Sequence, residues 1–463
     1  MTKLANPKMK YKAVLKLTLL TLAGLAATIQ LQAQSAPVAS AVVAARAPLT
    51  ISVELRQQTF DVVWRAVNEK HFDPTFGGVN WEQVRVKYTP LAAAAKSDAE
   101  FYTLLQQMLG ELHQSHFAII PPEAVPLIDD EDNHAASGEL GVEIKLIGAQ
   151  VFISRVKPDS AAARAGLRSG FALRQIGATP VAQLLQRFSK SPESESIKRL
   201  RTERLIMARL NGELGSTVNV SYLDERNQPR AAKLARARVN GEYSPAFGNF
   251  PPQRMEFEAK RLPSGHAYIR FNTWVTPVMP KLRAALRELA DAPGLIFDLR
   301  GNPGGIGGMA PGLGGHLFEK ETSLGRMQMR SGYTNFAIFP QTLQYSGPIV
   351  ILLDGGSAST SEVFASGMQE LGRAAIVGER SVGAALPSVF QKLPTGALFQ
   401  YAIGDFKTPK GTLIEGRGVL PDLEIKLTRA GLLAGRDLPL EAAVTQLERL
   451  QKRARPAAKA AGK

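Results

Sequence analysis

The chain has 463 residues, of which 44% are hydrophobic and 21% are charged, so it is long and apolar enough for two or three globular domains. It contains no cysteine, which excludes disulfides, thiolate catalysis and cysteine-ligated metal sites. The formal net charge is +15, but the basic residues are scattered over amphipathic segments and the two tails. Without zinc-finger spacing or a basic stripe interleaved with aromatics, this charge indicates a solvated surface and no nucleic-acid partner.

The start of the chain has the order of a secretory signal peptide. A lysine-rich stretch precedes the apolar run Leu17–Ile29, and small residues surround Ala33. The run is shorter than a comfortable membrane span, and an uncleaved N-terminal anchor helix is the alternative. We therefore expect a signal peptide over residues 1–33, a linker over residues 34–50, and a periplasmic or secreted protein with no membrane span in its mature form.

Helical periodicity follows the linker. Apolar residues recur at helical spacing in three segments, Leu55–Lys70, Trp81–Thr89 and Ala99–Leu112. They predict an N-terminal helical domain over residues 51–125.

From residue 138 the pattern changes to the alternation of strands. The expected strands are Gly141–Ile147, Gln150–Val156, Leu173–Ile176 and Thr217–Leu223, with a short helix at Ser160–Ala165 and a charged helical insertion at Glu193–Leu210. They predict a β-rich domain over residues 138–238, and a second linker follows it.

The C-terminal part alternates buried strands with helices. The expected strands are Ala267–Phe271, Gly294–Leu299, Pro348–Leu353 and Ala374–Val377, and the expected helices are Pro280–Ala290 and Glu362–Leu371. Unbroken apolar strands separated by helices are typical of a parallel sheet that is covered on both faces. We expect an α/β domain over residues 254–430 and a C-terminal helix with a basic tail over residues 431–463.

A serine-rich turn at residues 354–362 (DGGSASTSE) lies between a buried strand and a helix. Its small residues allow a sharp turn, and a serine at this position lies beside the free N–H groups of the helix start. Ser359 is therefore a candidate nucleophile. The alternative is a set of helix caps, because serine and threonine are preferred there.

A second glycine-rich turn, residues 298–305 (DLRGNPGG), follows the neighbouring strand. Its backbone amides are candidates for a second oxyanion donor, and it lacks the lysine and the glycine spacing of a phosphate-binding loop. A serine nucleophile also needs a base. Among six histidines, His116 is the candidate because Ser115 precedes it, and Glu415 is a carboxylate in a turn-rich segment. Spacing alone leaves open whether these groups meet.

Three segments together resemble the C-terminal-processing (tail-specific) serine peptidases. They are the serine turn with the following IVGE (residues 376–379), the DLRGNPGG turn, and TPKG through GVLPD (residues 408–422). The middle region, with GLRSG at residues 166–170, resembles the PDZ domain of that family. The resemblance spans about residues 50 to 430. It implies an α/β multidomain fold with a helical domain, a PDZ-like domain and a crotonase- or ClpP-like spiral catalytic domain, without cofactor or metal.

The chain departs from the best-known branch of this family, because Ala384 stands where that branch has a catalytic lysine. The tricorn-like branch uses a serine, a histidine preceded by a serine, and a glutamate. Resemblance to it implies that His116 is the base for Ser359, oriented by Ser115 and Glu415. The backbone N–H groups of Gly304, Gly305 and Thr360 would form the oxyanion hole.

The resemblance implies a serine endopeptidase that cuts exported proteins or peptides near their C-termini through an acyl-enzyme. The PDZ-like domain would bind a peptide C-terminus at Gly138, Leu140 and Gly141, and a structural or gating role is its alternative. The competing function is a catalytically silent protein that binds peptides or lipids. Ala384 favours the silent protein, whereas Ser359 and the Ser115-His116 pair favour the enzyme.

Overall fold

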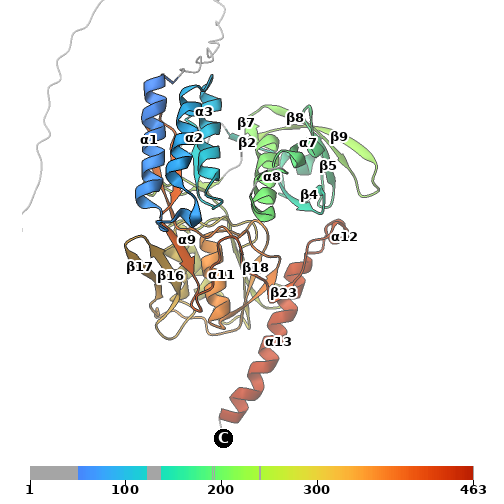
Figure 1. Ribbon diagram of the computed structural model, residues 1–463. Helices are drawn as coiled ribbons and strands as arrows, with labels where there is room; N and C mark the ends of the chain where they lie inside the picture. The colour runs from blue at the N-terminus through green and yellow to red at the C-terminus, as the bar shows by residue number, and fades with distance from the viewer. Residues whose placement is uncertain (1–50, 123–136, 190, 192, 239–240, 462–463) are drawn as a thin grey trace, which may run out of the picture. The chain divides into compact units, whose positions relative to one another are not determined.

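The computed structural model describes residues 51–122, 137–189, 191, 193–238 and 241–461, which form a mixed α/β structure (Figure 1). The expected signal peptide (1–33) and the linker (34–50) lie outside the described residues. In the part that the structure describes, no helix is both long and apolar enough to cross a membrane.

The N-terminal helices cover the ranges that the sequence predicts. They are α1 (Val53–Lys70), α2 (Trp81–Ala93) and α3 (Asp98–Gly110), with the short 3-10 helix η1 (Phe76–Gly78) after α1. Each α-helix begins at a polar side chain that accepts a backbone N–H of the first turn: Ser52, Asn80 and Ser97 respectively. Their apolar faces pack together around Phe60, Phe101 and Leu105.

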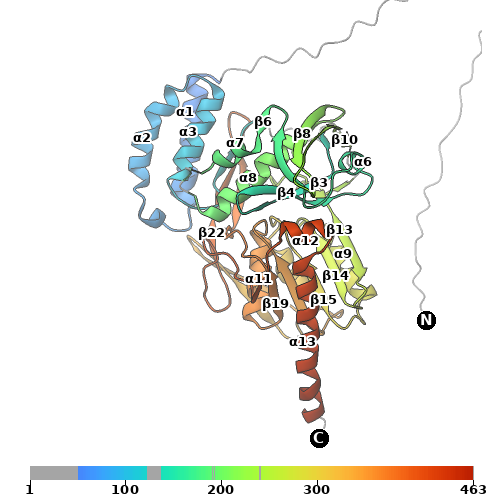
Figure 2. The ribbon, with the colours of Figure 1, turned by 90° about the vertical axis from the view of Figure 1, so that its right-hand side faces the viewer.

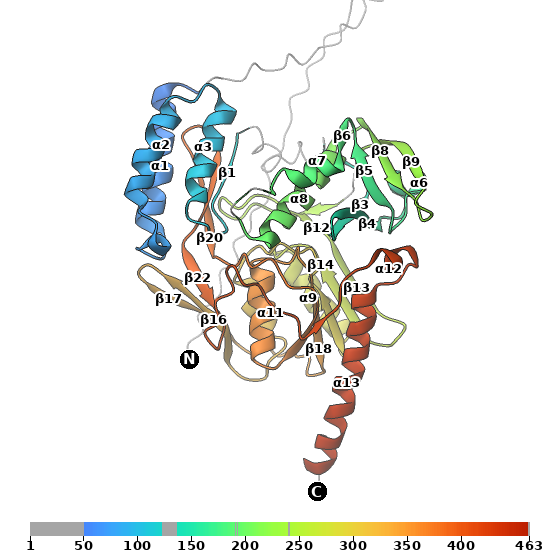
Figure 3. The same cartoon turned by 45° about the vertical axis from the view of Figure 1, so that its right-hand side comes forward.

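These helices share their core with a hairpin from much later in the chain. Strand β1 (Ala118–Ile120) pairs with β21 (Leu398–Ala402), which pairs with β20 (Ser388–Lys392), all antiparallel. Phe399 and Tyr401 are buried among the helices, and Figure 3 shows α3, β1 and β20 side by side. The end of the helical segment is therefore held against the C-terminal part.

The β-rich part has one main sheet with the strand order β3-β4-β5-β8-β9. Its strands are β3 (Val142–Ile147), β4 (Gln150–Val156), β5 (Ala172–Ile176), β8 (Thr217–Leu223) and β9 (Pro229–Ala235), with β6 (Thr179–Pro180) paired to β5. A small sheet joins β2 (Ser137–Glu139), β7 (Gly212–Glu213) and β10 (Ala237–Arg238). Helices α6 (Ala161–Arg164), α7 (Val181–Gln186) and α8 (Glu195–Leu210) complete it, and α8 places Ile206 and Leu210 in the core.

The C-terminal part is built on a six-stranded sheet with the order β13-β14-β15-β18-β19-β23. Its strands are β13 (Phe257–Arg261), β14 (Ala267–Phe271), β15 (Leu295–Asp298), β18 (Ile349–Leu353), β19 (Ala374–Gly378) and β23 (Leu423–Glu424). Strands β14 to β23 run parallel, which confirms the prediction, and β13 adds an antiparallel edge that the sequence did not indicate.

Helices cover both faces of this sheet, as its unbroken apolar strands predict. Helices α9 (Val278–Glu288), α10 (Met309–Gly314) and α11 (Thr360–Glu370) share one core with it, whereas α13 (Leu438–Ala461) packs Ala443 and Leu447 against the other face. A second sheet joins β16 (Thr322–Met329), β17 (Gly332–Ile338) and β22 (Gly404–Lys407). The short pair β11 (Glu242–Tyr243) and β12 (Arg254–Met255) precedes the main sheet.

The helix α12 (Arg429–Leu433) lies against the β-rich part (Figure 2). Its Leu432 packs on Phe152 and Ala172, and the Arg429 guanidinium donates to the carbonyl of Gly170 at 3.0 Å. The segment after the six-stranded sheet is thus tied to the β-rich part.

Candidate active site

The serine turn connects β18 to α11, with Ser359 directly before the first residue of the helix. Ser359 has φ 55° and ψ −121°, which a non-glycine residue adopts only under local constraint. Its backbone N–H lies 2.8 Å from the carbonyl of Ala384 and 3.0 Å from Oε2 of Glu362, and its carbonyl accepts the N–H of Val363 at 3.0 Å. Contacts on both sides therefore fix the backbone of this serine.

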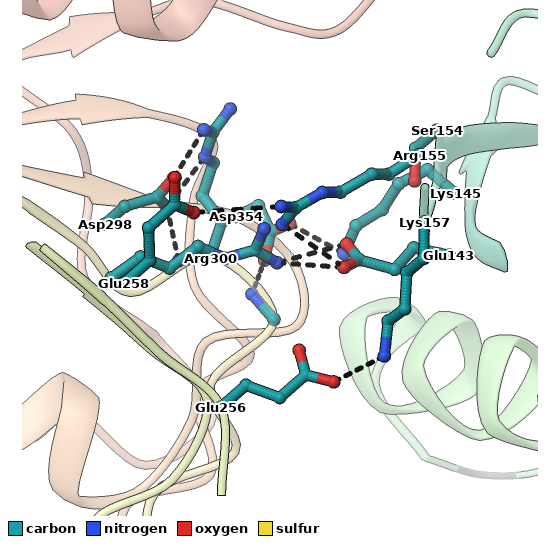
Figure 4. A network of polar contacts seen from close by, with 12 residues as sticks. Glu143, Lys145, Ser154, Arg155, Lys157, Glu256, Glu258, Asp298, Arg300 and Asp354 are labelled. Atoms are coloured by element: carbon teal, nitrogen blue, oxygen red, sulfur yellow. Dashed lines mark hydrogen bonds and ion pairs between the residues drawn. The ribbon is translucent and has the colours of Figure 1, made fainter. Parts of the chain in front are cut away.

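Asp354, at the start of the serine turn, holds the two glycine-rich turns together. Its Oδ1 accepts the backbone N–H of Gly301 at 2.9 Å and that of Gly356 at 2.8 Å, and Nζ of Lys145 on β3 lies 2.6 Å from Oδ2 (Figure 4). Burial alone would raise the pKa of Asp354, but the Lys145 ammonium and these N–H donors outweigh it and lower the pKa to about 2. The β-rich part thus supplies a charge that supports the turn of Ser359.

The DLRGNPGG turn lies directly against Ser359, and only glycine fits at its closest point. A Cβ atom on Gly304 would lie 2.6 Å from the Cβ of Ser359 and 2.9 Å from the nitrogen of Thr360, and φ of Gly304 is +97°. Oγ of Ser357 also donates to the carbonyl of Leu299 at 2.8 Å. The close approach requires glycine for both steric and backbone reasons.

Of the three expected oxyanion donors, two keep an uncommitted N–H group. The Gly304 N–H donates to Oδ1 of Asn302 at 3.0 Å, so it is engaged within its own turn. Within the described residues the N–H groups of Gly305 and Thr360 donate to no other residue. These two can point hydrogen-bond donors at an oxygen that develops negative charge.

Ser115, His116 and Glu415 form a continuous hydrogen-bonded chain. Glu415 accepts the backbone N–H of Ser115 at 2.8 Å and the Ser115 hydroxyl at 2.9 Å, and that hydroxyl lies 2.7 Å from Nδ1 of His116. A hydroxyl has one proton, which goes to the carboxylate because an ionised carboxylate only accepts. Ser115 must then accept from His116, so Nδ1 carries the proton and Nε2 is left with a free lone pair.

The local backbone explains how these side chains are placed. His116 has φ 62°, in a tight turn between α3 and β1. On the other side, Ala385 donates its N–H to Oε2 of Glu415 at 2.9 Å, and Gly416 donates to the carbonyl of Gly383 at 2.8 Å. Burial raises the pKa of Glu415, and the hydrogen bonds from Ser115 and Ala385 oppose the rise.

The His116 imidazole is neutral over most of the pH range. It keeps some accessible surface, but burial first, and the positive charge of Arg204 second, lower its pKa to about 4. In the described part of the chain no hydrogen bond joins His116 to Ser359. The structure therefore joins the candidate base to Ser115 and Glu415 and shows no hydrogen bond between it and the candidate nucleophile.

Glu362 is a residue of this site that the sequence argument missed. Its buried carboxylate accepts the Ser381 hydroxyl at 2.5 Å and the N–H groups of Gly383 and Ala384 at 2.6 and 3.0 Å, besides that of Ser359. Burial raises its pKa to about 7 although these hydrogen bonds oppose the rise. The available signal was a glutamate three residues after a helix-capping serine, a pattern that indicates only a helix start.

Ala384, at the position of the missing lysine, is enclosed by apolar side chains. It packs with Ala358 and Val382, and Ile197 and Leu200 of α8 pack against all three. A longer side chain at this position would therefore meet apolar neighbours from the β-rich part.

The expected peptide-binding loop is tightly packed. The Leu140 side chain is only 1% exposed, so it belongs to the core and can meet a ligand only through its backbone. Gly141 has φ +77°, and a Cβ there would lie 2.2 Å from the Cβ of Ser160. Gly138 pairs with Arg238 and Gly212 in the small sheet.

Over the residues that are described, no three His, Asp or Glu side chains form a group that would hold a metal ion.

Two family models match this chain. The model of peptidase family S41 matches residues 265–425, and that of the tricorn protease C1 domain matches residues 53–110. The first range contains the serine turn, the DLRGNPGG turn and Glu415. The second covers α1 to α3 and ends before Ser115.

Two proteins of similar sequence are named as C-terminal processing enzymes. The chain is 24% identical over 363 residues to the carboxyl-terminal-processing protease of Synechocystis, covering 78% of either protein. It is 25% identical over 389 residues to the chloroplastic C-terminal processing peptidase of Tetradesmus obliquus, covering 81% of this chain and 78% of that protein.

Solved structures share the fold at lower sequence identity. The photosystem II D1 C-terminal processing protease matches with a TM-score of 0.55 and 22% identity, over 82% of this chain and 96% of that one. Mature CPAF in complex with lactacystin matches with a TM-score of 0.59 and 14% identity, over 87% of this chain and 98% of that one.

Proposed function

This chain belongs to peptidase family S41 and is a serine peptidase, and on that premise we propose that it cleaves peptide bonds through an acyl-enzyme on Ser359 with His116 as general base. The observation that carries the proposal is the hydrogen-bonded chain from Glu415 through Ser115 to Nδ1 of His116, which leaves Nε2 free to accept a proton.

In the proposed reaction, Nε2 of His116 takes the proton of the Ser359 hydroxyl while its oxygen attacks the substrate carbonyl. The oxyanion that forms accepts the N–H groups of Gly305 and Thr360. His116 then returns the proton to the leaving amine, and water releases the acyl group by the same steps. Ser115 and Glu415 keep the imidazole in the required tautomer. The missing hydrogen bond between His116 and Ser359 forms when substrate is bound, because catalytic contacts often tighten only in that complex.

The substrates we propose are proteins or peptides cleaved near their C-termini. The support is the name of the relatives, which are C-terminal processing peptidases. We assign the binding of a peptide end to a PDZ-like domain over residues 138–238, with the backbone at Gly138, Leu140 and Gly141 as the site. The helical domain covers residues 51–125, the catalytic domain residues 254–430.

We further propose that the chain is exported, with residues 1–33 as a signal peptide and residues 34–50 as a linker. The order of the lysine-rich stretch, the apolar run and the small residues supports this. A C-terminal helix and basic tail over residues 431–463 complete the domain plan.

The test compares peptide cleavage by the mature protein with that of Ser359→Ala, His116→Ala and Glu415→Ala, together with labelling by a fluorophosphonate. We expect loss of cleavage in the first two and a smaller loss in the third. His113→Ala, an exposed histidine three residues before His116, is the matched control. A folded wild type that neither cleaves nor takes up the probe would favour a silent binding protein. Retained activity in His116→Ala would mean that the nucleophile is right and the base is wrong.

A further inference from the structure

One face of α8 lies against the serine turn. Ile197, Leu200 and Arg204 follow each other at positions i, i+3 and i+7, so they share a side of the helix. Ile197 and Leu200 pack on the apolar cluster that includes Ala358, the neighbour of Ser359. The next residue of the same face, Arg204, therefore lies on the side of α8 that faces the serine turn.

Arg204 lines a hollow of about 620 Å³ beside the two glycine-rich turns. Gly301 and Pro303 from one turn and Gly356 from the other line the same hollow. The side chain of Arg204 keeps exposed surface there, while the surrounding protein, and then the charge of Arg201, lower its pKa. Its positive charge also acts on the imidazole of His116. The guanidinium is therefore accessible to a ligand in this hollow, and its charge reaches the candidate base.

Arg204 lacks the kind of partner that three other cations of this helix have. Lys198 pairs with Glu195, Arg199 with Glu379, and Arg201 with Glu193, at 2.8, 3.3 and 2.9 Å. Arg204 makes no ion pair or hydrogen bond with another described residue. An accessible guanidinium without a partner presents a planar fork of donors that suits a planar anion, and carboxylate is the anion that a peptide provides.

We propose that Arg204 binds a carboxylate of the substrate, so that the peptidase prefers to cleave a peptide bond that lies close to such a carboxylate. This inference rests on the proposed function. The carboxylate can be the C-terminal one of a substrate cut close to its end, or the side chain of an aspartate or glutamate. Both carboxylates present two oxygens that can accept a pair of parallel hydrogen bonds from the guanidinium.

Binding at Arg204 has a consequence for the base. The charged groups that face His116 are Arg204 from α8 and, through Ser115, Glu415 from the closing segment. A carboxylate on Arg204 neutralises the nearer positive charge, so the imidazole accepts a proton more readily when such a substrate is bound. The contact between the substrate carboxylate and Arg204 then both recognises the substrate and makes His116 a better base.

The test measures kcat/KM on three peptides of one sequence: with a free C-terminal acid, with a C-terminal amide, and with the amide plus one glutamate near the cleaved bond. We expect wild type to prefer a carboxylate-bearing peptide by about 10- to 100-fold, the range of a charge-assisted hydrogen bond. Arg204→Gln brings the three values together, Arg204→Lys recovers part of the preference, and Arg201→Gln, paired elsewhere, keeps it. Preference for the free acid assigns the terminal carboxylate, and preference for the glutamate peptide assigns a side chain.

Equal rates on all three peptides in wild type, or an unchanged preference in Arg204→Gln, overturns the proposal. The second outcome would assign any preference for a free end to the PDZ-like domain. Binding of the same peptides to Ser359→Ala, with and without Arg204→Gln, is measured by calorimetry in parallel. That measurement needs no catalysis, so carboxylate-dependent binding through Arg204 supports the inference even if the catalytic assignment fails, and its absence overturns it.

Discussion

Ser115 and Glu415, 300 residues apart in the chain, are joined by two hydrogen bonds, one from the backbone N–H of Ser115 and one from its hydroxyl. The carboxylate also accepts the N–H of Ala385. All of these groups donate to Glu415. The carboxylate therefore determines where each proton lies in the hydrogen-bonded chain from Glu415 through Ser115 to His116.

Glu415→Gln tests this arrangement with the smallest change of shape. The amide places an NH2 group where the carboxylate accepted hydrogen bonds, so at least one buried donor faces another donor. We expect kcat to fall by about 10²- to 10⁴-fold with little change in KM, as when the orienting acid of a triad is lost. Steady-state kinetics with circular dichroism as a folding control provides the measurement. A kcat within threefold of wild type would remove Glu415 from the relay.

Gly304→Ala tests the close approach of the two turns. The added Cβ would meet the Cβ of Ser359 at 2.6 Å in a backbone conformation that favours glycine. We expect near-complete loss of activity and a lower melting temperature. Gly301→Ala in the same turn is the matched control, since it has φ +72° but nothing within 4 Å of its added Cβ. Equal losses in both variants would attribute the effect to backbone strain and contradict a steric role at Ser359.

The pH dependence of kcat/KM reports the base in the free enzyme. His116 acts as a base only when it is neutral, and its pKa is about 4, so the limb of the pH profile that belongs to His116 should lie near pH 4. Arg204→Gln removes a charge that disfavours the protonated ring, so the rise should move part of the way toward the ordinary value of about 6.5. Arg201→Gln is the control for loss of charge on α8. A limb that stays in place in Arg204→Gln would contradict the proximity of the two groups.

Glu362 should make stability depend on pH. Its pKa is about 7 in the folded protein and 4.5 ordinarily, so the folded state keeps a proton that the unfolded chain releases between these values. Its contribution is therefore complete below pH 4.5 and is lost as pH rises through 7. One pKa step corresponds to about 1.4 kcal/mol, so the loss is on the order of 3 kcal/mol.

The measurement is the free energy of unfolding by denaturant from pH 4 to 8, for wild type and Glu362→Gln. The difference in the free energy of unfolding between wild type and Glu362→Gln should shrink with rising pH. The reason is that wild type loses the contribution of Glu362, whereas glutamine does not titrate. Glu225→Gln, at an exposed turn, is the control and should follow wild type. Parallel curves for wild type and Glu362→Gln would show that Glu362 has no raised pKa.

Local sequence pattern was enough for the N-terminal helices, for the buried strands that flank the site and for the two turns of the site. The apolar runs at Ile349–Leu353 and Leu295–Asp298 form neighbouring parallel strands, as the period and the residue types predict. A serine-rich turn follows the first strand and a glycine-rich turn follows the second. Such features depend on residues close together in the chain, so residue spacing and side-chain type are enough to predict them. The motif resemblance implied that the candidates Ser115, His116 and Glu415 act together with Ser359.

Only the tertiary structure decided which of these groups meet. The pairing of β1 with β21 brings the turn of His116 to the C-terminal part, where Glu415 accepts from Ser115. Burial, which no local pattern specifies, gives Glu362 its raised pKa, and the packing of α8 leaves Arg204 beside the base. The physical reason is that hydrogen bonds and desolvation depend on distances between segments hundreds of residues apart, whereas periodicity reports only what each segment does by itself.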